Sequence, residues 1–75
     1  MKSTKIRLNT FNDIKDFVNI VTKYDFEVDL TSERYVVDAK SIMGIYSLDL
    51  SKSVEAKIYS DNCDEFLKEI ERFNG

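Results

Sequence analysis

The chain has 75 residues, of which 43% are apolar and 33% charged, with two glycines and no proline. This composition predicts one small globular domain over residues 1–75, near the lower size limit for folding without a disulfide or a metal. The net charge of −3 argues against nucleic acid as a partner, because phosphate backbones are bound by basic faces.

The residue types exclude further classes of site. Cys63 is the only cysteine and there is no histidine, so we expect neither an internal disulfide nor a transition-metal site. A reducing cytoplasm is the compartment that fits a lone cysteine. No apolar run approaches the roughly 20 residues that span a bilayer, and the N-terminus has no signal-peptide pattern. No base–nucleophile pair is visible, so we predict no catalytic residue, no cofactor and no enzymatic activity.

The first elements follow from side-chain periodicity. Residues 4–9 alternate polar and apolar side chains, which predicts a half-buried strand. Residue types that cap helices come next, and both Thr10 and Asn12 fit the N-cap position. Apolar residues then recur three and four positions apart, the spacing of one buried helical face. We expect this amphipathic helix to run over residues 12–24.

A switch to a period of two predicts a β-hairpin after this helix. Its strands are residues 26–30 and 35–39, and residues 31–34 form a polar turn without glycine. A type I geometry is therefore expected in this turn rather than a primed one.

The end of the chain predicts one more strand and one more helix. Residues 54–59 alternate again, and residues 60–62 supply caps for a helix over residues 63–73. With a short helix after the hairpin, the element order is β-α-β-β-α-β-α. This order predicts a two-layer α+β fold, in which three helices cover one face of a four-stranded antiparallel sheet.

That short helix, at residues 42–48, has more apolar surface than it can bury. Ser41 is placed to cap it, with its hydroxyl accepting the backbone N–H of Gly44. At 100° per residue the apolar side chains form two sets, so one set closes the core and the other is left in water for a docking partner or a homodimer. The sets are Ile42, Met43 and Tyr46 on one side and Ile45 and Leu48 on the other.

The segment from Lys40 to Leu48 closely resembles the regulatory-serine segment of HPr, the histidine-containing phosphocarrier family of the bacterial sugar phosphotransferase system. It reads Lys40-Ser41-Ile42-Met43-Gly44, then Ile45, Tyr46, Ser47 and Leu48. The predicted element order is also that of the HPr fold, an open-faced β-sandwich. The resemblance therefore implies a single HPr-like domain of a bacterial cytoplasmic protein.

The resemblance fails at the phosphocarrier loop. HPr proteins carry His-Ala-Arg-Pro at the start of the first helix, where this chain has Thr10, Phe11, Asn12 and Asp13. Transfer of a phosphohistidine needs an imidazole, and a threonine phosphate is too stable an ester to pass onward. We therefore expect no phosphocarrier activity, and weaker attraction to an acidic enzyme I surface because the family arginine is absent.

What the resemblance still implies is regulation at Ser41. The matching HPr serine is a target of HPr kinase/phosphorylase, its product is a corepressor for a catabolite-control transcription factor, and a relative without the histidine keeps only this role. Lys40, Ile42, Met43 and Tyr46 are the expected partner-binding residues. Two alternatives stay open: Ser41 is only a helix cap, and the chain is an interaction or structural module that keeps the fold without the phosphotransferase partners.

Overall fold

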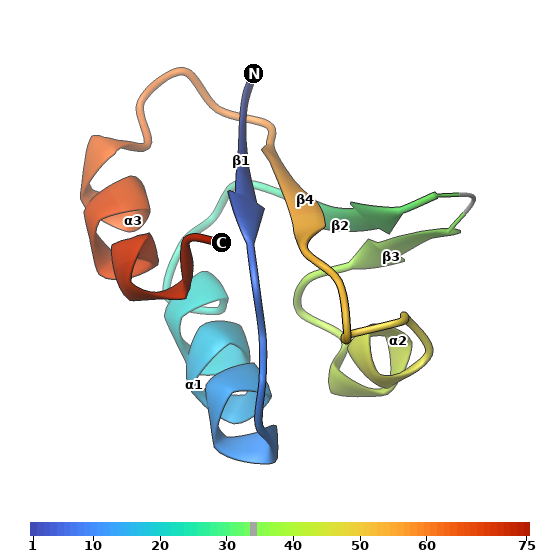
Figure 1. The fold of residues 1–75 in the computed structure, drawn as a ribbon. Coiled ribbons are helices and arrows are strands. Elements are labelled where there is room, and N and C mark those ends of the chain that lie inside the picture. The colour runs from blue at the N-terminus through green and yellow to red at the C-terminus, as the bar shows by residue number, and fades with distance from the viewer. Residues whose placement is uncertain (34) are drawn as a thin grey trace.

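Four strands and three α-helices follow the predicted order in the computed structural model, which describes residues 1–33 and 35–75 (Figure 1). The elements are β1 (Lys2–Ile6), α1 (Phe11–Val21), β2 (Val28–Ser32), β3 (Tyr35–Asp38), α2 (Ile42–Tyr46), β4 (Val54–Ile58) and α3 (Asp64–Glu69), with a 3₁₀ helix η1 (Glu71–Phe73) after α3.

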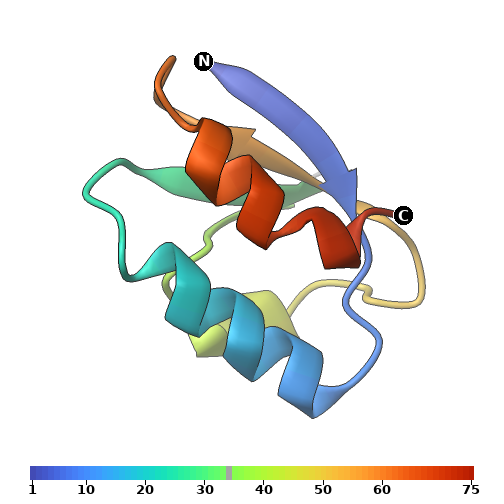
Figure 2. The ribbon, with the colours of Figure 1, turned by 90° about the vertical axis from the view of Figure 1, so that its left-hand side faces the viewer.

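The strands form one antiparallel sheet in the order β1-β4-β2-β3. Ala56 of β4 lies opposite Thr4 of β1 on one side and opposite Leu30 of β2 on the other. All helices lie on one face of this sheet, with α1 and α3 running side by side across it (Figure 2). The predicted α+β sandwich is therefore confirmed, and its other face is left open.

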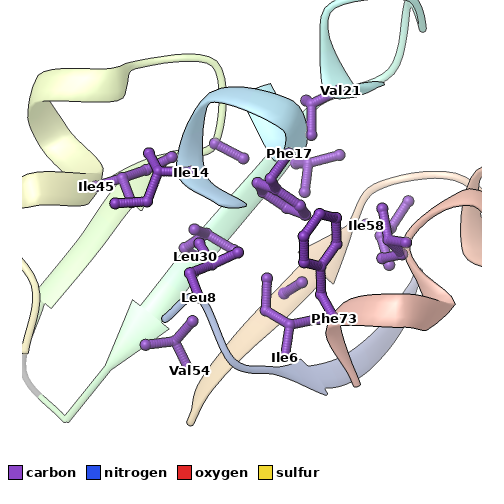
Figure 3. Close-up of a cluster of buried hydrophobic side chains, with 14 of the residues drawn as sticks. Ile6, Leu8, Ile14, Phe17, Val21, Leu30, Ile45, Val54, Ile58 and Phe73 are labelled. Atoms are coloured by element: carbon purple, nitrogen blue, oxygen red, sulfur yellow. The ribbon is translucent and has the colours of Figure 1, made fainter. Parts of the chain in front are cut away.

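One core fills the space between the two layers. In Figure 3, Phe17 of α1 and Phe73 of η1 meet above the sheet, with ring centroids 5.8 Å apart at 87°. The edge-to-face arrangement is one that aromatic pairs prefer. The two central strands, β2 and β4, contribute every second residue to this core, because successive side chains of a strand point to opposite faces of the sheet. The fully buried side chains include Ile6, Phe17, Val21, Leu30, Ile45, Ile58, Phe66 and Ile70.

Several element boundaries differ from the predicted ones. The first strand is Lys2–Ile6 instead of residues 4–9, although Leu8 beyond it is still buried. The first helix ends at Val21 instead of residue 24, and the chain turns so that two later aromatic rings reach the core. The last helix breaks at Ile70, whose φ of −94° and ψ of 2° leave helical geometry before η1 begins. In each case tertiary packing overrides the local pattern.

The predicted type I turn in the hairpin is wrong. Ser32 pairs with Tyr35, so the connection is two residues long, and the first of them, Glu33, has φ of +50°. A positive φ at this position belongs to the primed turns, whose twist matches that of the flanking strands. Thr31 and Ser32 of the predicted turn belong to β2, and its last residue, Arg34, lies outside the described residues.

The predicted side-chain cap of the last helix is also wrong. Cys63 occupies the N-cap position, and no side chain caps the helix there. Ser60 instead accepts a hydrogen bond from the backbone N–H of Asn62, at 3.1 Å. Asp61 accepts one from the N-terminal amine of Met1, at 2.8 Å.

Glu69, the last residue of α3, forms hydrogen bonds to the turn that follows α1. Its carboxylate accepts hydrogen bonds from the Lys23 ammonium at 2.9 Å and from the Tyr24 hydroxyl at 3.0 Å. The Lys23 bond is the main cause that holds the pKa of Glu69 below its ordinary value. Partial burial, followed by the bond to Glu69, raises the pKa of Tyr24 to about 12.

Acid should therefore weaken the fold at Glu69. A carboxyl whose pKa is lowered by folding stabilises the native state above its unfolded pKa, and this stabilisation is lost as pH falls through the folded pKa. We expect the urea midpoint to fall as pH drops below the ordinary glutamate value of 4.5. Glu69→Gln should flatten that fall, and the exposed Glu71→Gln should leave it unchanged. Identical profiles for both variants would contradict the assignment.

Candidate functional site

Ser41 lies at the point where β3 turns into α2. Its hydroxyl Oγ accepts the backbone N–H of Gly44 at 3.2 Å, so the predicted N-cap is present. Asp38 sets up this turn, because its carboxylate accepts the N–H of Lys40 at 2.9 Å and its carbonyl accepts that of Ser41 at 3.0 Å. The Ser41 side chain is exposed, and Lys40 beside it is half-buried. A capped and accessible hydroxyl therefore stands at the start of α2.

Gly44 allows α2 to lie close to the strand beneath it. A Cβ at this position would lie 3.3 Å from Ser41 Oγ and 3.3 Å from Val37 Cβ, which is tighter than an ordinary van der Waals contact. The glycine thus keeps α2, with its capping serine, against β3.

The two predicted sides of α2 are observed. Ile45 is fully buried and Leu48 is 6% exposed, whereas Met43 is 75% and Tyr46 44% exposed. Ile42 is partly buried at the edge of the core. The side with Met43 and Tyr46 is therefore an exposed apolar surface, and the other side closes the core.

The structure at the start of α1 shows which of the two candidate residues, Thr10 or Asn12, caps the helix. Thr10 is the N-cap, and its Oγ1 accepts the backbone N–H of Asp13 at 3.1 Å. The Asp13 carboxylate in turn accepts the N–H groups of Asn9 at 3.0 Å and Thr10 at 3.3 Å, which completes a capping box. The place at the head of α1 that attracts anions is therefore occupied by the chain's own carboxylate.

Removing the threonine hydroxyl should measurably destabilise this end of α1. We expect Thr10→Ala to lower the free energy of unfolding by about 1 kcal/mol, because a helix loses its side-chain cap. Asn12→Ala, at an exposed position outside the capping box, is the matched control and should change it by less than about 0.5 kcal/mol. Urea unfolding measures both, and equal losses would contradict the assignment of the cap.

The two predicted sites meet through an aromatic stack. The rings of Phe11 and Tyr46 lie 5.9 Å apart between centroids and 10° from parallel, and both side chains are exposed, Phe11 by 57% and Tyr46 by 44%. The first residue of α1 and the last residue of α2 thus form one continuous surface. We call this the docking surface, and it consists of Phe11, Ile42, Met43 and Tyr46.

The sequence placed Phe11 in the degenerate loop and did not reveal its contact with Tyr46. The only sequence feature that could have indicated this contact was an aromatic residue at the first position of the helix. The contact depends on how α1 packs against α2, which side-chain periodicity within either helix does not determine.

The described residues hold few groups that could bind a metal or perform chemistry. They contain no group of three or more histidine, cysteine or acidic side chains placed to hold an ion. Cys63 is buried, with Sγ 3.5 Å from the carbonyl of Ser60. Within the described part of the chain, no helix combines the length and apolar character needed to cross a bilayer. The arrangement at α1 and α2 therefore offers a hydroxyl and an apolar contact surface.

The architecture is that of an open-faced α+β sandwich, in which the start of α1 contacts the end of α2. The family model for the PTS HPr component phosphorylation site, where PTS is the phosphotransferase system, matches residues 13–74. The crystal structure of HPr-C-His from Thermoanaerobacter tengcongensis superposes with a TM-score of 0.80 at 26% sequence identity, covering 96% of this chain and 89% of that one. The chain belongs to the HPr family. The matched range begins at Asp13, so Thr10, Phe11 and Asn12 lie outside it.

Proposed function

We propose that this HPr family member is a regulatory protein-binding domain that does not carry phosphohistidine. It acts in the bacterial cytoplasm as one domain over residues 1–75, without enzymatic activity. Its partners, carried over from the family, are HPr kinase/phosphorylase and either enzyme I or a catabolite-control regulator. They bind the docking surface, and phosphorylation of Ser41 switches that binding.

The observation that carries the proposal is the chemistry at the head of α1. By resemblance to the family, Thr10 takes the position of the histidine, and the sequence contains no histidine to replace it. The Asp13 carboxylate accepts two backbone N–H groups there, so an incoming phosphoryl group would meet a like charge. Without an imidazole that accepts and releases phosphate at neutral pH, the carrier step has no chemical route.

The switch at Ser41 is supported by its exposure and its place on the chain. A phosphate on Oγ would add nearly two negative charges at the start of α2, beside the Gly44 N–H and Lys40. This placement stabilises a helix rather than melting it. Asp38 opposes it slightly, since its carboxylate is close in sequence and bonded to the Lys40 N–H. The modified chain would thus remain folded and present an altered charge next to Met43.

A structural or interaction module that keeps the fold without phosphotransferase partners is the second candidate. The Ser41 hydroxyl already accepts the Gly44 N–H, so its role as a cap explains the residue without any modification. The exposed aromatic stack would then contact a different partner or a second copy of the chain.

Incubation with HPr kinase and ATP distinguishes the two candidates. The proposal expects the mass increase of one phosphate, lost in Ser41→Ala and kept in Ser47→Ala, whose hydroxyl donates to the Gly44 carbonyl at 2.6 Å. Amide shifts on titration with enzyme I and with the kinase should centre on the docking surface. If the chain is not phosphorylated and neither partner shifts its amide signals, the proposal is contradicted and the second candidate is favoured.

A further inference from the structure

Asp38, the last residue of β3, holds the turn that leads into α2 (Figure 1). Its carboxylate accepts the Lys40 N–H at 2.9 Å, and its backbone carbonyl accepts the Ser41 N–H at 3.0 Å. A side chain that binds the backbone two residues further on forms an Asx turn, which aspartate and asparagine both support. The turn is anchored to the sheet, because Ala39 is fully buried and donates its N–H to the Val28 carbonyl at 2.9 Å. The position of Ser41 therefore depends on a side-chain oxygen of Asp38.

The two serines at the ends of α2 differ in the direction of their hydrogen bonds. Ser41 Oγ accepts the Gly44 N–H at 3.2 Å, which fixes the oxygen without using the hydroxyl proton. Ser47 Oγ instead donates its proton to the Gly44 carbonyl at 2.6 Å. In phosphoryl transfer from ATP, the hydroxyl oxygen bonds to the γ-phosphorus, the bond from that phosphorus to ADP breaks, and a base of the kinase takes the hydroxyl proton. Ser41 is held in a state suited to this step, whereas Ser47 would first have to give up its bond to the helix.

Asp38 also brings a negative charge close to Ser41. Its side chain is exposed, and within the described part of the chain neither Asp38 nor Lys40 forms an ion pair. The γ-phosphate of ATP is an anion, so a carboxylate three residues before the attacking hydroxyl opposes its approach. Water and salt weaken this repulsion at an exposed site without removing it. The oxygen and the charge of Asp38 therefore act in opposite directions, and asparagine would keep the first without the second.

We propose that Asp38 is a positioning residue for the phosphorylation of Ser41: its side-chain oxygen holds the hydroxyl in place for the kinase, and its charge slows the transfer. This inference rests on the proposed function, because it concerns the same site. It adds a residue outside the docking surface that sets the rate of the modification rather than the affinity for the kinase. The chain is accordingly a slower substrate than the geometry of its turn would allow.

The test is steady-state phosphorylation of the full chain by the HPr kinase and ATP, with kcat and KM measured for each variant. Asp38→Ala should lower kcat about tenfold, because a hydroxyl that is no longer held in place reaches the reactive geometry less often. Asp38→Asn should restore kcat and raise it about threefold above that of the wild type, the effect of removing one nearby charge in a water-like dielectric. Neither variant should change KM, whereas Met43→Ala on the docking surface should raise KM with little change in kcat.

Asp49→Asn is the matched control. Asp49 forms a similar turn beyond the other end of α2, where its carboxylate accepts the Ser51 N–H at 3.1 Å. The same substitution there removes one charge at a distance from Ser41, so kcat and KM should stay at the wild-type values.

Two results would overturn the inference and leave the proposed function standing. One is that Asp38→Ala is phosphorylated as fast as the wild type, and the other is that Asp38→Asn is no faster than the wild type. A chain that is not phosphorylated in any of these forms would instead contradict the proposed function, and this inference with it. Urea unfolding, expected to show that Asp38→Ala is folded under the assay conditions, keeps a loss of structure from being taken for a loss of positioning. Asp38→Asn keeps the turn and tests the charge independently.

Discussion

Phe66→Ala should lower the free energy of unfolding by about 3–5 kcal/mol, the cost of emptying a large buried site. Phe66 is fully buried, and its ring lies 5.2 Å from that of Tyr24 and 5.4 Å from that of Phe26 between centroids. Both neighbours come from the turn after α1, so the cavity would loosen α3 and this turn together. A small domain has only about 5–15 kcal/mol of stability, and the loss would remove much of it.

Phe11→Ala is the matched control, because the same side chain is deleted at a surface position. Its ring is 57% exposed and touches Tyr46 as an exposed stack, so we expect a loss of about 1 kcal/mol or less. Urea unfolding at constant pH measures both variants, and similar losses would mean that Phe11 is part of the core. Phe11→Ala should also weaken partner binding to the docking surface while leaving the fold intact. This would distinguish the role of Phe11 at the surface from that of Phe66 in the core.

The fold followed from the sequence wherever burial is set by a single element's periodicity. The stripe of Ile14, Phe17 and Val21 appears on the inner face of α1, as its helical spacing predicts. Val54, Ala56 and Ile58 alternate into the core from β4. The division of α2 into a buried and an exposed side also followed, since a rotation of 100° per residue is a local property.

What the sequence did not reveal depends on contacts between distant segments. The stack of Phe11 on Tyr46 requires the packing of α1 against α2. The pairing of Asn74 with Ile6 joins the two ends of the chain and has no local signal. The turn at Glu33 was predicted from residue preference, but the two-residue connection between paired strands selects a positive φ even for a glutamate.

The head of α1 forms a complete helix cap within the fold of the HPr family. The Thr10 and Asp13 side chains accept three backbone N–H groups at the helix start, so under the proposed function the position of the family histidine serves as a structural cap. Next to it, Phe11 stacks on Tyr46 and extends the exposed apolar side of α2. Under the proposed function, these neighbouring residues replace a phosphate site and enlarge a contact surface.

Thr10→His alone is therefore expected not to produce an efficient phosphocarrier. The new imidazole would stand beside the Asp13 carboxylate, which the N–H groups of Asn9 and Thr10 now hold in place, and the family arginine would still be missing. Adding Asn12→Arg and Asp13→Asn removes the like charge and supplies a cation, while asparagine keeps an oxygen for the capping bonds.

Acid-labile phosphate formed after mixing with phosphorylated enzyme I measures the difference between the two variants. The triple variant should be modified at least about tenfold faster than Thr10→His, since about 1.4 kcal/mol of relieved repulsion corresponds to that factor. The wild-type chain should take up none. Amide spectra that match the wild type outside residues 9–13 would show that both variants fold. Equal rates for the two variants would mean that Asp13 does not hinder phosphorylation. The missing imidazole alone would then account for the lost carrier activity.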